Sequence, residues 1–132
     1  MLKTPFNQLT CLLFLTVLTS PCQAEWTEIH ADQDTLYYYD LSTRLGGKKP
    51  RISALRSFRQ PTSHGDQSAR LLYEADCENK KIRLMSGVYT KNKTGDGEVS
   101  GMINSNGWMD PSSRIVLEKV YAALCEVGLN AQ

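Results

Sequence analysis

The chain has 132 residues, of which 22% are charged and 41% hydrophobic, and its formal net charge is +1 at neutral pH. This length fits one domain with a modest core, and so small a net charge predicts no partner by itself. No apolar run approaches the ~20 residues that a membrane-spanning helix needs, which excludes a transmembrane anchor.

Residues 1–24 have the layout of a secretory signal peptide. A single positive charge at Lys3 precedes an apolar run over residues 11–18, and small residues stand at Cys22 and Ala24, the third-last and last positions of the segment. This pattern predicts export and cleavage between Ala24 and Glu25, so that residues 25–132 form a single mature domain.

Cys22 leaves a second interpretation open, in which the chain is a lipoprotein acylated at this cysteine. Pro21 directly before Cys22 and Thr19 three positions before it make a poor lipobox. Cleavage after Ala24 is therefore the preferred prediction, and lipidation at Cys22 is its alternative.

Two cysteines, Cys77 and Cys125, remain after removal of residues 1–24, which leaves 108 of the 132 residues. An even pair of cysteines in an oxidising compartment predicts a disulfide. Closing a loop of this length is worth roughly 4 kcal/mol in the chain-entropy estimate, a large share of the stability of a small domain.

Short runs rich in aromatic and β-branched residues, separated by turn-forming residues, fill the chain as far as Ile103. They predict antiparallel strands at 26–29, 35–41, 51–58, 70–77, 82–89 and 98–103. Alternation along the fourth strand places Leu71, Tyr73, Ala75 and Cys77 on its core face.

One convincing helix follows Pro111. Its expected N-cap is Ser112 or Ser113, its body covers residues 114–127, and it ends at Gly128. Its apolar stripe would lie against the sheet and turn Cys125 toward it. The predicted fold class is α+β, an antiparallel sheet of about six strands with one C-terminal helix on one face; the stripe comprises Leu117, Val120, Tyr121 and Leu124.

Basic residues gather in one segment between Asp40 and Asp66 that contains no acidic residue. This segment could attract an acidic partner such as a matrix glycoprotein, a sulfated glycan, lipid phosphates or haem propionates, or it could be a solvated loop and strand. An outward-facing tyrosine of the triplet 37–39 could add a binding anchor. The candidate binding patch is Arg44, Lys48, Lys49, Arg51, Arg56, Arg59 and Tyr38.

Catalytic and metal-binding groups find little support in the sequence. His30 and His64 are expected on different surface loops without metal-ligand spacing, and no serine has the context of an activated nucleophile. Glu74 and Asp76 share one strand face and are expected to solvate it. We therefore expect no enzyme, no metal site and no cofactor.

Four segments carry a resemblance to a known family. They are the strand Leu-Tyr-Glu-Ala-Asp-Cys at 72–77, the strand Lys-Ile-Arg-Leu at 81–84, the glycine-spaced segment 94–99, and the approach from Trp108 to the cysteine-bearing helix. Together they resemble the surface-adhesin protein E family over residues 26–125. The resemblance implies a small exported protein of Gram-negative bacteria, built as a sheet and a C-terminal helix joined by a disulfide, and its founding type binds host extracellular-matrix proteins.

These observations predict a non-catalytic exported binding module, adhesin-like, that recognises an extracellular protein or glycan. The alternative is a periplasmic protein that binds a small ligand such as haem, or another envelope protein. The predicted location is the periplasm or the outer cell surface of a Gram-negative bacterium, where nucleic acid is not an expected partner. A homodimer through an exposed strand edge is left open.

Overall fold

The computed structural model describes residue 18 and residues 24–126 of the chain. Most of the predicted signal peptide, the candidate acylation site Cys22, and the expected helix end at residues 127–128 lie outside the described residues. Within the described part, no helix combines the length and apolar character that crossing a membrane requires.

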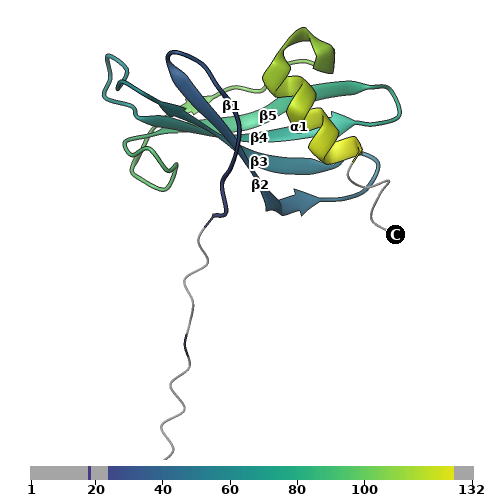
Figure 1. Ribbon diagram of the computed structural model, residues 1–132, viewed down its shortest axis with the longest axis horizontal. Coiled ribbons are helices and arrows are strands. Elements are labelled where there is room, and N and C mark those ends of the chain that lie inside the picture. The colour runs from purple at the N-terminus through teal and green to yellow at the C-terminus, as the bar shows by residue number, and fades with distance from the viewer. Residues whose placement is uncertain (1–17, 19–23, 127–132) are drawn as a thin grey trace, which may run out of the picture.

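Six strands form one antiparallel sheet in which each strand pairs with the next along the chain (Figure 1). This confirms the predicted sheet, and the third strand has the predicted bounds, whereas the others differ by one to four residues at an end. The strands are β1 (Thr27–Ala31), β2 (Thr35–Leu45), β3 (Arg51–Phe58), β4 (Ser68–Asp76), β5 (Lys81–Thr90) and β6 (Val99–Ile103).

The core lies between one face of this sheet and the C-terminal helix, and we call this face the helix side. Because side chains alternate along a strand, every second residue of β3, β4 and β5 enters the core. Leu71, Tyr73 and Ala75 of β4 are buried there, as predicted. The intervening residues point to the opposite face, the far side of the sheet.

The helix α1 (Ile115–Cys125) lies across the helix side of the sheet (Figure 1). Leu117, Val120 and Leu124 are buried and Tyr121 is half-buried, which confirms the predicted apolar stripe. These side chains pack against the helix side of the sheet and complete the core.

The predicted N-cap of this helix is wrong. Residues Pro111–Ser113 form a separate 3₁₀ turn, because the carboxylate of Asp110 accepts a hydrogen bond from the Ser112 backbone N–H. Arg114 then adopts an extended conformation, so α1 starts one residue later than predicted and has no side-chain cap.

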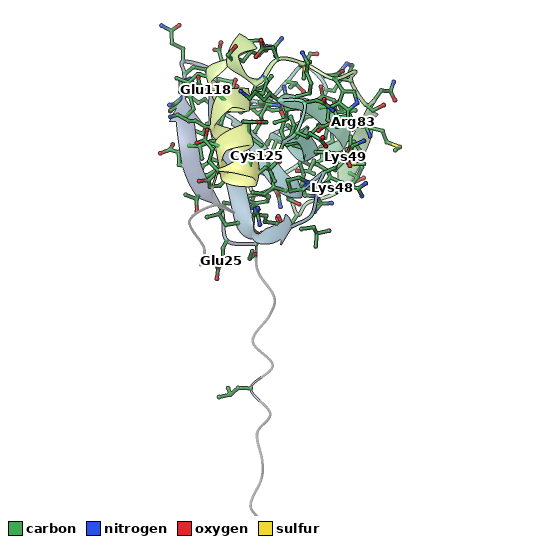
Figure 2. The ribbon with its side chains drawn as sticks, turned by 90° about the vertical axis from the view of Figure 1, so that its right-hand side faces the viewer. Glu25, Lys48, Lys49, Arg83, Glu118 and Cys125 are labelled. Carbon is green, nitrogen blue, oxygen red and sulfur yellow. A yellow bond between two sulfur atoms is a disulfide. The ribbon has the colours of Figure 1, made fainter. Side chains whose placement is uncertain are left out.

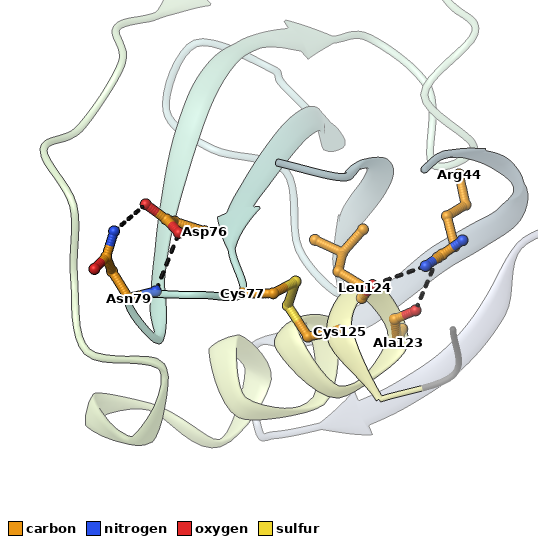
Figure 3. Close-up of a disulfide and its surroundings, with 7 residues drawn as sticks. All are labelled: Arg44, Asp76, Cys77, Asn79, Ala123, Leu124 and Cys125. Carbon is orange, nitrogen blue, oxygen red and sulfur yellow. Dashed lines mark hydrogen bonds between the residues drawn. A yellow bond between two sulfur atoms is a disulfide. The ribbon is translucent and has the colours of Figure 1, made fainter. Parts of the chain in front are cut away.

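Three contacts attach the C-terminal half of α1 to the sheet (Figure 3). Cys77, at the end of β4, forms the predicted disulfide with Cys125, with 5.5 Å between their Cα atoms. Arg44 of β2 donates hydrogen bonds to the carbonyl oxygens of Ala123 and Leu124, at 3.2 Å and 2.9 Å. A guanidinium at this position satisfies the last carbonyl groups of the helix, and its positive charge compensates the negative end of the helix dipole.

A bulge in β2 gives Arg44 its position. Asp40 pairs with Ser53, but Leu45 pairs with Arg51, so β2 has three more residues than β3 over this stretch. The hydroxyl of Thr43 accepts the Ser53 backbone N–H at 2.9 Å and replaces a lost ladder bond. The extra residues bring Arg44 to the end of α1.

Candidate functional site

The predicted basic patch is divided between several parts of the domain. Arg44 caps α1, as described above. Arg56 points to the helix side, because it alternates with Leu55 along β3 and pairs with Tyr37 and Ala69. Arg59 follows β3 and donates to the backbone oxygen of Asp32 at 3.1 Å.

Tyr38 lies on the far side of the sheet, where it pairs with Glu28 and Leu55 and is half-buried. Four residues along β3 separate Leu55 from Arg51, which corresponds to about 13 Å. Tyr38 is therefore not next to the basic residues at the start of β3. Three members of the predicted patch, Lys48, Lys49 and Arg51, do stay close together on the far side.

Arg51 belongs to a row of three charged residues that crosses β3, β4 and β5. Glu74 of β4 pairs in register with Arg51 on one neighbouring strand and with Arg83 on the other. Its two carboxylate oxygens accept hydrogen bonds from Arg51 Nε at 2.9 Å and from Arg83 Nε and Nη2 at 3.0 Å and 2.8 Å. One carboxylate thus orients two guanidinium groups.

Glu74 is only 2% exposed, so the expectation that it solvates an exposed face is wrong. Burial by itself raises the pKa of Glu74, but the hydrogen bonds from Arg51 and Arg83 outweigh burial and hold the pKa below its ordinary value. Glu74 is therefore ionised at neutral pH. Its role is structural, because it fixes the positions of the two arginines.

Trp108 lies over this row. The segment that follows β6 runs beside β5, where Met109 exchanges two backbone hydrogen bonds with Ile82. Met109 packs against the core, and its neighbour Trp108 covers Arg83, whose guanidinium carbon is 4.4 Å from the ring centroid. Lys49 Nζ approaches the same ring at 5.6 Å. Both distances permit cation–π attraction.

We call this region the Trp108 surface; it comprises Lys48, Lys49, Arg51, Arg83 and Trp108 with the carboxylates of Glu74 and Asp76. Figure 2 shows Lys48, Lys49 and Arg83 on one side of the domain, away from α1. Glu74 is buried in the arginine row, and Asp76 accepts two hydrogen bonds from Asn79. The accessible groups are therefore mainly cationic, around a tryptophan that remains 37% exposed.

The two histidines do not meet. His30 lies on β1 and not on a loop as expected, and its ring contacts that of Tyr37 with 5.6 Å between centroids. His64 is exposed in the loop between β3 and β4. Across residues 24–126, no group of three or more histidine, cysteine or acidic residues is arranged to hold a metal ion.

Sequence reasoning identified Lys48, Lys49 and Arg51 but missed Arg83 and Trp108 as members of the surface. Arg83 carried a usable signal, since the short turn after Cys77 fixes the hairpin register that pairs it with Glu74. Trp108 stands in a polar segment, and nothing in its neighbourhood predicts that this segment returns to β5.

Comparison with known proteins finds a match at the level of the family. No curated protein and no solved structure matches the chain. The family model described as surface-adhesin protein E matches residues 26–126. This match covers all six strands, the helix and both cysteines of the disulfide, so the chain belongs to the surface-adhesin protein E family.

Proposed function

We propose that this chain is an exported, non-catalytic binding module that recognises an acidic segment of an extracellular-matrix protein through the Trp108 surface. Membership of the surface-adhesin protein E family supports an adhesin-like surface protein. The observation that carries the proposal is the pairing of an exposed tryptophan with cations held in fixed positions by Glu74.

The chemistry of this surface suits an acidic protein partner. Tryptophan and arginine are the residues most enriched at the energetic centres of protein interfaces. Arg51 and Arg83 are held by Glu74 before a partner arrives, so little side-chain freedom is lost on binding. Lys48 and Lys49 are exposed and add long-range attraction for an acidic partner.

Export supports the same proposal. The signal-like residues 1–24 predict transfer out of the cytoplasm, with cleavage between Ala24 and Glu25. A disulfide such as that between Cys77 and Cys125 persists in oxidising compartments. The proposed location is therefore the cell envelope, with the domain facing outward.

Replacement of Trp108 is expected to weaken binding to a matrix protein by tenfold or more, because truncation of a central tryptophan typically removes at least about 2 kcal/mol of binding energy. The measurement is biolayer interferometry against immobilised vitronectin, laminin and heparin, with Trp108→Ala and Trp108→Phe. The phenylalanine variant should recover part of the affinity, since an aromatic ring is restored over Arg83.

In the same experiment, Lys49→Glu tests the contribution of electrostatic attraction. Its matched control is Lys93→Glu, which reverses the charge of an exposed lysine in the β5–β6 loop. Lys49→Glu should reduce binding most at low salt, whereas Lys93→Glu should have little effect. Matrix binding that survives both Trp108→Ala and Lys49→Glu would contradict the proposal. Binding to heparin alone would assign the surface to a sulfated glycan instead.

A further inference from the structure

A cleft with a volume of ≈ 250 Å³ lies on the helix side of the sheet, opposite to the Trp108 surface. Its walls come from the first half of α1, the hairpin of β1 and β2, the middle of the sheet, and the segment 106–109. The cleft thus lies between elements of the same packed domain, and residues outside the Trp108 surface form it.

Two guanidinium groups face this cleft. Arg56 enters it from β3, and its Nε is buried and has no hydrogen-bond partner among the described residues. Arg114 enters from the start of α1 and is exposed. Within residues 24–126, neither arginine forms a salt bridge. A buried hydrogen-bond donor without a partner is unusual in a folded protein, and a bound molecule could provide the missing acceptor.

The one carboxylate of the cleft does not serve as that acceptor. Asp32 accepts hydrogen bonds from the backbone N–H groups of Asp34 and Thr35, at 2.9 Å and 2.8 Å, and from the Tyr37 hydroxyl at 3.1 Å. These bonds shape the turn between β1 and β2 and occupy both oxygens of Asp32. The lining thus has two positive charges, at Arg56 and Arg114, against the single negative charge of Asp32, so the cleft is net positive.

Other groups in the cleft suit an anionic head and an apolar body. Burial raises the pKa of Tyr73, so its hydroxyl is protonated and can donate at neutral pH. The N-terminal residues of α1 line the cleft, and no side chain caps this end of the helix, whose dipole favours an anion. Apolar side chains form the rest of the wall: Leu84, Met109, Ile115, Val116 and Leu117.

We propose that this cleft binds a small amphipathic anion, whose carboxylate or phosphate head pairs with Arg56 and Arg114 and whose short apolar body lies against α1. Guanidinium groups bind both head groups well. The volume of ≈ 250 Å³ is just below the range of about 300–1,000 Å³ for drug-sized ligands, so the ligand carries a single short chain or ring. Ile115, 51% exposed, marks the open end of the cleft.

Calorimetric titration of the exported protein with octanoate, octyl phosphate and octanol tests this proposal. One of the two anions should bind with 1:1 stoichiometry, and octanol should bind at least tenfold more weakly. The tighter of the two anions identifies the preferred head group. Absence of binding by both anions, or octanol binding as tightly as they do, would overturn the proposal.

Variants identify the site. Arg56→Gln should weaken anion binding tenfold or more, while Arg70→Gln, an exposed arginine on the far side of β4, should change it less than twofold. Arg114→Gln alters an exposed residue and gives a second test if Arg56→Gln destabilises the fold. Binding that neither Arg56→Gln nor Arg114→Gln weakens would place the anion elsewhere and contradict the inference. The Trp108 surface lies on the opposite face, so matrix binding and anion binding can fail independently.

Discussion

Reduction of the disulfide between Cys77 and Cys125 is expected to lower the free energy of unfolding by about 4 kcal/mol. The bridge spans a sequence separation of 48 residues, and the chain-entropy estimate for a loop of this length gives that magnitude. The disulfide also joins α1 to the sheet, so the helix loses its cross-link to the residue that directly follows β4. Because the total free energy of unfolding of a small domain is about 5–15 kcal/mol, this loss is a large share of its stability.

Urea unfolding with and without reductant measures this effect. The matched control is a double variant, Cys77→Ala with Cys125→Ala, which should show the same loss and no further response to reductant. We expect α1 to separate first, since Arg44 and Lys119 would then be its main polar attachments to the sheet. An unfolding midpoint that reductant leaves unchanged would show that the bridge contributes nothing to stability.

Asp40→Asn is expected to lower the free energy of unfolding by about 3 kcal/mol in the processed protein, which begins at Glu25. The loss should be much smaller in a protein that keeps residues before Glu25. Asp40 is 1% exposed, and no lysine or arginine among the described residues forms a salt bridge with it. The backbone nitrogen of Glu25 donates to Asp40 Oδ2 at 3.0 Å. Cleavage after Ala24 would turn this nitrogen into a charged amino group beside a buried carboxylate.

Breaking a buried ion pair by removing one partner typically costs about 3–5 kcal/mol, and we expect the lower end because Glu25 is exposed. Before cleavage the same nitrogen is a neutral amide, and the loss falls to that of an ordinary hydrogen bond, about 1 kcal/mol. Comparing Asp40→Asn in proteins with and without the N-terminal extension isolates the charge of the amino group. Equal losses in both backgrounds would refute pairing of the new N-terminus with Asp40.

Local patterns predicted most of the fold because they repeat over several residues. Alternation along β4 placed Leu71, Tyr73 and Ala75 in the core, and helical spacing did the same for Leu117, Val120 and Leu124. The bulge in β2 was not predictable, because it depends on Thr43 and Arg44 finding partners in β3 and α1.

The helix start was mispredicted for a related reason. Ser112 and Ser113 have the residue type of an N-cap, but the Asp110 carboxylate binds Ser112 first and closes a separate turn. Capping preferences do not indicate which of several neighbouring polar residues will act as the cap. Such competition is decided by backbone geometry that the sequence does not display.

The binding surfaces were harder to predict than the fold, because they join residues that are distant in sequence. The run of basic residues is continuous in the chain, yet alternation sends Arg51 to the far side of the sheet and Arg56 to the helix side. Glu74, Arg83 and Trp108 complete the Trp108 surface from three other segments. Charge clustering along the chain therefore indicated part of one site and part of another.

Protease accessibility of the native protein on intact cells tests the proposed adhesin role most directly. A periplasmic protein of known location serves as the control for an intact outer membrane. We expect protease to digest this domain while the control survives, because an adhesin-like module must be exposed to matrix proteins. Protection of the domain until the outer membrane is opened would contradict the account and assign it to periplasmic partners.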